Sequence, residues 1–279
     1  MSTEYKSLRV EKQSGVAGVA GVVEVVLTGP GKGNAMGPDF WREMPLLFEE
    51  LDRDDETRAV IIRGEGGNFS YGLDLMAMAG DIGVGSLNNL AAERTKFLDK
   101  VAEMQQACNR VADCRKPVIA AINGWCIGGG LDLISACDIR LAAADAKFSL
   151  REAKIAIVAD LGSLQRLPAI IGQGHTRELA FTGKDIDAAR AHHIGLVNDV
   201  YDTPEALLEA ARKLAADIAA NPPLVVQGVK QVMNYCADKS IVDGLRYVGV
   251  WNSAFMHSLD LVEAITAFKE RRKPDFKGQ

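Results

Sequence analysis

Three acidic residues lie in the middle of the sequence in settings that suit proton transfer. Asp132 closely follows a glycine run, Glu152 comes twenty residues later, and Asp160 has apolar neighbours on both sides. A carboxyl group in apolar surroundings has a raised pKa and exchanges protons near neutral pH. Two or three such acids around one pocket predict an enzyme that moves protons on carbon. The alternatives are a surface ion pair of Glu152 with Arg151 or Lys154, and a helix cap for Asp160.

The glycine-rich segment 123–130, just before Asp132, lies between a predicted buried strand and a predicted helix. Glycines let a ligand approach the backbone closely, and free N–H groups in the first turn of a helix favour negative charge. The segment therefore predicts a site for a developing oxyanion. The alternative is a glycine-rich connection that serves only tight packing. The segment is not a dinucleotide-binding fingerprint, because Gly-x-Gly-x-x-Gly is absent.

A second glycine-containing segment, 67–75, also follows a predicted buried strand. It offers another backbone N–H group at Leu73. The alternative is a plain strand-to-helix turn in which Asp74 acts as a cap. Two such segments, each at the end of a strand, are what an oxyanion hole with two donors requires.

The remaining reactive residue types argue against other chemistry. The chain has five cysteines and no CxxC pair, so neither a disulfide scaffold nor a zinc site is expected. The four histidines lack the spacing of metal ligands, and we expect no metal. Cys126 is predicted to be a buried thiol, and Asp138 a structural residue paired with Arg140. Because no Gly-x-Ser-x-Gly elbow is present, a hydrolase of the α/β class is not expected.

The elements that must position these residues alternate between strand and helix patterns. Short buried strands are predicted at 22–27, 58–63, 117–122, 138–143 and 146–149. Helical spacing is found at 36–51, 87–113 and from 128 to 135. After residue 203 the pattern is helical throughout, at 205–220, 224–237, 240–258 and 260–270. The fold class is therefore α/β, with units of strand and helix around a parallel sheet in 1–203 and a helical subdomain in 204–279.

Composition limits the partners of the chain. It has 279 residues, 48% of them hydrophobic and 25% charged, and these values predict a folded globular protein. The net charge of −5 does not favour nucleic acid as a partner. No apolar stretch is long enough for a membrane helix, and the first residues lack the features of a targeting segment. We therefore expect a cytoplasmic protein.

The two glycine-rich segments together resemble those of the crotonase (enoyl-CoA hydratase/isomerase) superfamily. The resemblance covers almost the whole chain, from the turn at 33–36 through 165–168 to the end at 269–276. It implies a spiral of ββα units with a C-terminal helical region that forms trimers, and hence a homotrimer or homohexamer. It also implies an acyl-CoA substrate, with no separate cofactor because coenzyme A is part of that substrate.

The resemblance also implies roles for single residues. The N–H groups of Leu73 and Gly129 would form the oxyanion hole for the thioester oxygen. The residues implied to contact the substrate around them are Ser70, Tyr71, Gly72, Asp74 and Gly128. Many members of the superfamily have a lysine before the phenylalanine of the first loop, near the CoA phosphates. This chain has Gly67 and Asn68 there, so Lys273 and Lys277 are considered as substitutes, with plain solvated lysines as the alternative.

The acids indicate which reaction the chain performs. Hydratases of the superfamily have two glutamates at the positions of Asp132 and Glu152, and usually a small residue at that of Asp160. The three acids together are similar to Δ3,5-Δ2,4-dienoyl-CoA isomerases, which move a proton from C2 to C6. We expect Glu152 to face C2 and Asp160 to lie near C6, with Asp132 orienting or tuning Glu152. The alternative reaction is hydration of 2-enoyl-CoA, and a binding-only relative for acyl-CoA or RNA is a third reading.

Overall fold

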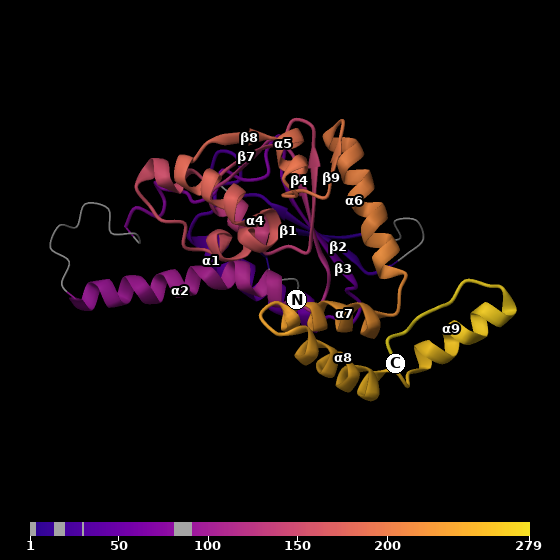
Figure 1. The fold of residues 1–279 in the computed structure, drawn as a ribbon. Helices are drawn as coiled ribbons and strands as arrows, with labels where there is room; N and C mark the ends of the chain where they lie inside the picture. Colours follow the sequence, from indigo (N-terminus) through magenta and orange to yellow (C-terminus); the bar gives the residue numbers. More distant parts are fainter. Residues whose placement is uncertain (1–3, 14–19, 30, 81–90) are drawn as a thin grey trace.

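The larger sheet of the protein carries most of its core. The computed structural model describes residues 4–13, 20–29, 31–80 and 91–279 (Figure 1). The strand order in this sheet is β1-β2-β3-β4-β6-β9. Its strands are Leu8–Gln13, Val22–Leu27, Ala59–Gly64, Val118–Ile122, Ile139–Ala143 and Asp199–Tyr201. Strand β1 runs antiparallel to β2, and the other neighbours in the sheet are parallel.

A smaller sheet lies beside the first and has the order β5-β7-β8. Its strands are Trp125–Ile127, Lys147–Ser149 and Asp185–Asp187. Strand β5 lies within the glycine-rich segment 123–130 and pairs in parallel with β7. Strand β7 leads into a 3-10 turn, Arg151–Ile155, which carries Glu152. This sheet therefore brings the glycine-rich segment and one of the three acids together.

Helices cover both faces of the larger sheet. On one face lie α1 (Pro38–Arg53), α2 (Ala91–Asp113), α3 (Gly129–Ser135), α4 (Ser163–Thr182) and α5 (Ala188–His193). The other face packs against α6 (Pro204–Ala219) through small residues such as Ala211 and Ala215. Side chains alternate along β2, so Val23 and Val25 join the first cluster while Val22 joins the second. Because both faces are covered, β2, β3 and β4 are mostly apolar along their length, with Glu24 and Arg63 as charged exceptions.

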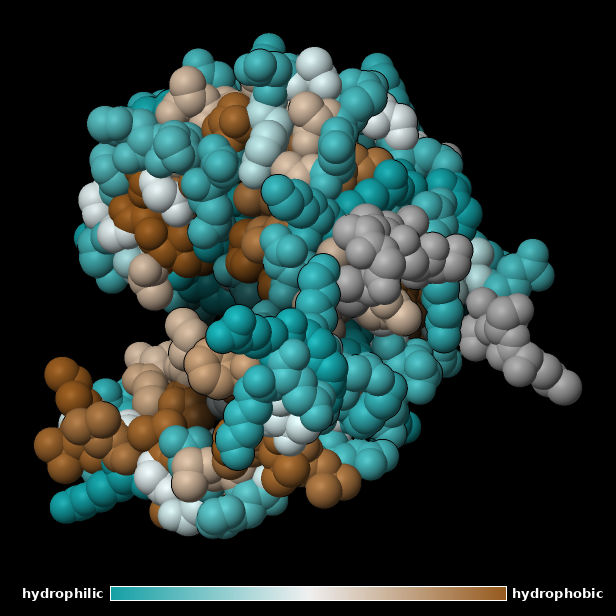
Figure 2. Space-filling view, turned by 90° about the vertical axis from the view of Figure 1, so that its right-hand side faces the viewer, coloured by the Kyte–Doolittle hydropathy of each residue, from teal (hydrophilic) through white to brown (hydrophobic). Residues whose placement is uncertain are grey.

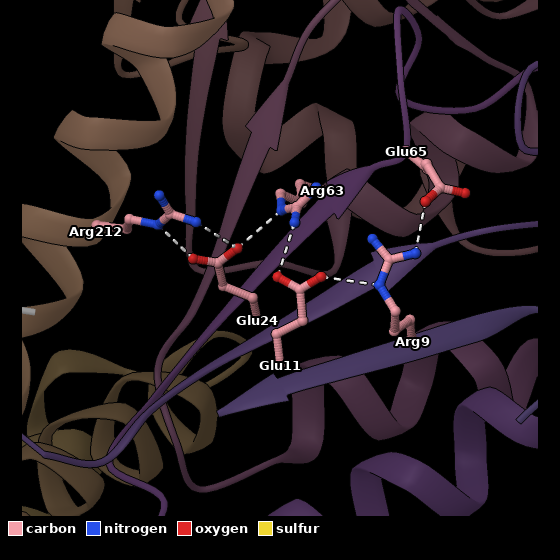
Figure 3. A network of polar contacts seen from close by, with 6 residues as sticks. All are labelled: Arg9, Glu11, Glu24, Arg63, Glu65 and Arg212. Atoms are coloured by element: carbon pink, nitrogen blue, oxygen red, sulfur yellow. Dashed lines mark hydrogen bonds and ion pairs between the residues drawn. The ribbon is translucent and has the colours of Figure 1, made fainter. Parts of the chain in front are cut away.

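A charged network crosses the face covered by α6 (Figure 3). Glu24 of β2 is fully buried, and its carboxylate accepts hydrogen bonds from Arg63 of β3 at 2.8 Å and from Arg212 of α6 at 2.5 and 3.1 Å. Arg63 also donates to Glu11 at 3.0 Å, and the network continues to the surface through Arg9. These bonds connect three strands and a helix that follows them by more than a hundred residues.

The C-terminal helices α7 (Pro223–Cys236), α8 (Ile241–Phe255) and α9 (Leu259–Glu270) extend below the sheet (Figure 1). Figure 2 shows hydrophobic side chains gathered on this lower part of the molecule. The exposed apolar residues of these helices include Val229, Met233, Leu245, Val250, Phe255, Leu259, Val262 and Phe268. A cavity of about 350 Å³ lies between the three helices, with Trp251 in its wall. So many exposed apolar side chains on adjacent helices are unusual for the surface of a monomer.

The α/β class and the C-terminal run of helices are confirmed. The predicted strand at 22–27 has the observed ends, and the other predicted strands differ from the observed ones by one residue at one or both ends. The sequence did not predict β1, β5, β8 or β9, which are at the edge of a sheet or only three residues long. The predicted helix at 87–113 is present from Ala91, and its first residues lie outside the described part of the chain. The predicted helix at 240–258 ends at Phe255.

Candidate active site

The two glycine-rich segments lie side by side because they follow neighbouring parallel strands. Strands β3 and β4 are paired in parallel, so the segments that leave them start from the same edge of the sheet. Phe69 N–H donates to Asn123 O at 2.8 Å, Ser70 N–H to Trp125 O at 2.9 Å, and Ile127 N–H to Ser70 O at 3.0 Å. The segments therefore form one continuous backbone surface.

Two backbone N–H groups on this surface are available to a ligand. The hydrogen bonds of the bridge between Met36 and Leu73 use Gly72 O and Asp74 N, so the Leu73 N–H points away from Met36. Gly129 is the first residue of α3, where an N–H group has no partner within the helix. A Cβ atom built on Gly129 would lie 3.6 Å from Leu73 N, which places the two groups close together. Their use as a pair of donors for one oxygen atom stays a prediction.

A pocket of about 470 Å³ opens next to these donors. Its lining includes Leu73, Gly129 and all three acids that the sequence singled out. The other lining residues are Tyr71, Leu75, Trp125, Ile127, Gly128, Arg151, Ile155, Ile157 and Leu161. The pocket thus combines mainly apolar walls with carboxyl groups, and this suits an aliphatic chain on which protons are moved.

Gly128 sets the position of Glu152 relative to the donors. Its φ of +53° lies in the region that favours glycine. A Cβ atom at this position would lie 3.0 Å from Glu152 Oε1, so the absence of a side chain makes room for the carboxyl group. Glu152 therefore lies against the residue that precedes the Gly129 donor.

The three acids affect one another and are shifted toward neutral pH. Burial, assisted by the charge of Asp132, raises the pKa of Glu152 to about 7. Burial raises the pKa of Asp132 to about 6, although hydrogen bonding to Ser163 acts in the opposite direction. Burial also raises the pKa of Asp160, and the charge of Asp160 raises the pKa values of the other two. A cluster with these properties can hold and release protons near neutral pH.

The structure decides between the two interpretations of Glu152 and Asp160. Arg151 makes its ion pair with Asp185 at 2.8 Å, and Glu152 forms no ion pair among the described residues. One oxygen of Glu152, Oε2, is buried and has no hydrogen-bond partner in that part of the chain. Helix α4 starts after Gly162 without a side-chain cap from Asp160. Both acids are therefore pocket residues and not a surface pair and a cap.

Several residues of the first loop shape its backbone. Ser70 is fully buried, donates from Oγ to Asn34 O at 2.8 Å and accepts from Gly72 N–H at 3.0 Å. Asp74 accepts from the N–H groups of the turn that follows it. Ser70, Gly72 and Asp74 are absent from the pocket lining in the described part of the chain, whereas Tyr71 is present. Contact of these three residues with a bound acyl-CoA stays a prediction.

The sequence did not single out several residues of the pocket. Trp125 lies in the wall, and the cationic groups of Lys147 and Arg151 lie 5.2 and 5.1 Å from its ring centroid. Ile155 and Ile157 follow Glu152 and add apolar wall. The signal for Trp125 was its place inside the glycine-rich segment. The two isoleucines have none, because an apolar residue in a turn does not reveal which space it lines.

Other predictions are changed or stay open. Asp138 pairs with Lys230 at 2.7 Å, and not with Arg140, whose guanidinium donates to backbone carbonyl groups instead. Lys277 pairs with Asp275 and Lys273 is exposed, and contact of either lysine with the CoA phosphates stays a prediction. Cys126 is fully buried. In residues 4–13, 20–29, 31–80 and 91–279 no cluster of three or more histidine, cysteine or acidic residues could hold a metal ion.

The comparisons with known proteins agree with this geometry. The family model for enoyl-CoA hydratase/isomerase matches residues 17–279. The chain is 45% identical to the mitochondrial Δ(3,5)-Δ(2,4)-dienoyl-CoA isomerase of Dictyostelium discoideum, over 99% of this chain and 92% of that protein. It is 39% identical to the peroxisomal enzyme of that name from Arabidopsis thaliana, over 98% and 97%. An enoyl-CoA hydratase structure from Bacillus anthracis superposes with a TM-score of 0.87 at 32% identity, covering 98% of this chain and all of that one. Among the helices of the described residues, none has the length and apolar character to cross a membrane.

Proposed function

The chain belongs to the enoyl-CoA hydratase/isomerase family, and from this premise we propose that it converts 3,5-dienoyl-CoA into 2,4-dienoyl-CoA. The observation that carries the proposal is the presence of three acids with raised pKa values in one pocket beside two available N–H groups. Relatives named as dienoyl-CoA isomerases support the same reaction. Coenzyme A enters as part of the substrate, and the proposal needs no separate cofactor.

In the proposed mechanism, the N–H groups of Leu73 and Gly129 hold the thioester oxygen. Loss of a proton from C2 leaves a dienolate whose negative charge is concentrated on that oxygen, and the two donors stabilise it. Glu152 takes the C2 proton, an assignment supported by the close approach of its carboxyl group to Gly128, the residue before the Gly129 donor. Asp160 gives a proton to C6, and the double bonds move into conjugation with the thioester.

The reaction needs one carboxyl group ionised and the other protonated. The pKa of Glu152 is raised to about 7, so its ionised form is populated near neutral pH, and burial raises the pKa of Asp160, which favours its protonated form. Asp132 influences this balance through its charge, which raises the pKa of Glu152. We propose that Asp132 tunes Glu152 in this electrostatic way, since no hydrogen bond joins the two side chains in the described part of the chain.

The test compares two substrates on the purified protein. With 3,5-octadienoyl-CoA we expect absorbance of the conjugated 2,4-dienoyl thioester to appear, and with crotonyl-CoA little loss of the enoyl thioester. The variant Asp160→Asn should bind the first substrate but convert it at least about 100-fold more slowly, as expected for loss of an acid–base group. Rapid hydration of crotonyl-CoA with no isomerisation would reject the proposal in favour of the hydratase, the alternative that uses Asp132 and Glu152 alone.

The exposed apolar face of α7, α8 and α9 supports a homo-oligomer. We propose a homotrimer, or a homohexamer made of two trimers. Phe268 is 86% exposed and Val250 68% exposed, so much apolar surface would be removed from water by a second copy. Sedimentation equilibrium of the protein and of Phe268→Glu tests this. A monomeric wild-type protein would contradict it.

The predicted cytoplasmic location is likewise open, since relatives carry mitochondrial and peroxisomal names, and a fluorescent fusion would decide it.

A further inference from the structure

Helix α2 contacts the segment that carries Asp160 through a side chain that lies outside the pocket lining. Gln105 Nε2 donates a hydrogen bond of 2.7 Å to the backbone oxygen of Asp160. Gln105 is partly buried, and its neighbours Met104 and Ala107 belong to the core. Gln105 therefore belongs to a helix whose position is fixed by packing against the core. The carbonyl group it binds belongs to the residue whose carboxyl group we assign to C6.

One turn further along α2, a second contact holds the same segment. Asn109 Oδ1 accepts a hydrogen bond of 2.7 Å from Arg166 Nη2, and Arg166 Nη1 donates to Leu161 O at 3.4 Å. Residues four apart on a helix lie on the same face, so Gln105 and Asn109 point toward one segment. The arrangement fixes the carbonyl groups of two consecutive residues, Asp160 and Leu161.

The chain between Asp160 and α4 depends on such contacts because it contains a glycine. Gly162 has a φ of +126°, which only glycine adopts readily. A Cβ atom at this position would lie 1.8 Å from Arg166 Nη1, so the guanidinium group packs directly on the glycine. Glycine in a turn allows many conformations unless neighbouring groups restrict them. Here the restricting groups come from α2 and α4.

We propose that Gln105 is a positioning residue that holds Asp160 at the distance needed for proton transfer to C6. The inference rests on the proposed function, because it assumes that Asp160 acts on the substrate. In this proposal Gln105 contacts neither the substrate nor the carboxyl group of Asp160. It acts through the backbone of Asp160, and Asn109 with Arg166 supports the following residue in the same way.

The experiment replaces Gln105 by methionine, which has a similar length and cannot donate a hydrogen bond. The neighbouring Gln106 is exposed, and Gln106→Met provides the matched control. We expect Gln105→Met to lower kcat by about 10-fold to 100-fold, since small misplacement of a reacting group has effects of this size. KM should change by less than about threefold, because the oxyanion hole and the pocket walls are retained.

A deuterium measurement separates positioning from general damage. In D₂O, Glu152 can remove the C2 proton and return a deuteron whenever transfer to C6 is slow. We therefore expect Gln105→Met, like Asp160→Asn, to accumulate deuterium at C2 of unreacted 3,5-octadienoyl-CoA faster than the wild type, relative to conversion. Damage to the whole site would lower exchange and conversion together, and this result would overturn the inference.

The remaining outcomes are also decisive. If Gln105→Met converts substrate as fast as Gln106→Met while Asp160→Asn is inactive, the inference is wrong and the proposed function stands. If Asp160→Asn is fully active, the assignment of Asp160 fails and the inference fails with it. Should Gln105→Met not fold, Asn109→Ala offers the second test, with a smaller loss of kcat and the same rise in exchange expected. Unchanged kcat and exchange in that variant would contradict the inference.

Discussion

Asp132 Oδ1 accepts a hydrogen bond of 2.6 Å from the backbone N–H of Ser163, the first residue of α4. The same carboxyl group lines the pocket with Glu152 and Asp160. Asp132 therefore has two functions, since it satisfies an N–H group that the helix leaves without a partner and it contributes charge to the acid cluster. Sequence reasoning assigned it only the second.

The two functions of Asp132 can be separated by two substitutions. Asp132→Asn keeps an oxygen that can accept from Ser163, whereas Asp132→Ala removes it. We expect the alanine variant to be less stable than the asparagine variant by about 1–2 kcal/mol, the usual value of a helix-capping interaction. Urea denaturation at one pH measures the difference. Equal stabilities would mean that the hydrogen bond to α4 contributes nothing.

The activity should depend on the ionisation of Glu152. Because its pKa is raised to about 7, the carboxyl group is mostly protonated at pH values below that and cannot act as a base. We expect kcat/KM for 3,5-octadienoyl-CoA to rise as the pH increases through about 7. Steady-state rates across this range test the prediction. A profile that is flat between about pH 6 and pH 8 would contradict the role of Glu152 as base.

The stability should have the opposite dependence on pH. In the unfolded chain Glu152 ionises near its ordinary pKa of about 4.3, whereas in the folded protein it holds its proton up to about pH 7. The folded state binds more protons between these values, so the free energy of unfolding falls as the pH rises through this interval. We expect Glu152→Gln to be more stable than the wild type at about pH 8, and similar to it at about pH 4. The exposed Glu209 provides the control Glu209→Gln, which should track the wild type in thermal denaturation at both pH values.

Gly128 should be sensitive to a single added methyl group. In Gly128→Ala the new Cβ atom would press on Glu152 Oε1, and the φ of +53° would be strained. Gly66 also has a positive φ, of +67°, but no atom lies within 4 Å of its missing Cβ. The positive φ alone should cost each variant about 1–2 kcal/mol of stability, and only Gly128→Ala should lose activity. Equal kcat values in the two variants would show that Glu152 tolerates displacement.

The buried network at Glu24 predicts very unequal effects of its arginines. Arg212→Met removes a partner from a carboxylate that is fully buried, and we expect a loss of about 2–4 kcal/mol in unfolding free energy. Arg9→Met acts on an exposed ion pair and should cost less than about 1 kcal/mol. Chemical denaturation of both variants tests this. Similar losses would mean that Arg63 alone satisfies Glu24.

The sequence predicted the parts of the site that depend on local chemistry. Asp160 was noticed because its neighbours are apolar, and Asp132 because it closely follows a glycine run. The donor at Leu73 was noticed because a glycine-containing segment follows a buried strand, whereas the donor at Gly129 was implied by the family resemblance. The strand at 22–27 was found because five of its six residues are apolar, most of them valine, as expected for a strand covered on both faces. The family resemblance then supplied the reaction.

What could not be predicted depends on contacts between distant segments. The partner of Asp138 is Lys230, ninety-two residues away, and spacing favoured its neighbour Arg140 instead. The hydrogen bond from Gln105 to Asp160 joins a helix whose residues show only amphipathic spacing to a loop fifty-five positions later. Strands such as β8 and β9 contain three residues each, too few for a period of two to be recognised.

The proposed oxyanion hole requires the segments around Ser70 and Cys126 to pair, so neither segment can form it alone. Helices can form during refolding while these two segments are still apart, and a thioester has no pair of donors to bind until they meet. Recovery of ligand affinity should therefore trail recovery of the helical circular dichroism signal. Conversely, a bound acyl-CoA would contact both segments and stabilise their pairing. It should slow amide hydrogen exchange in both of them by a factor that grows with the concentration of free ligand.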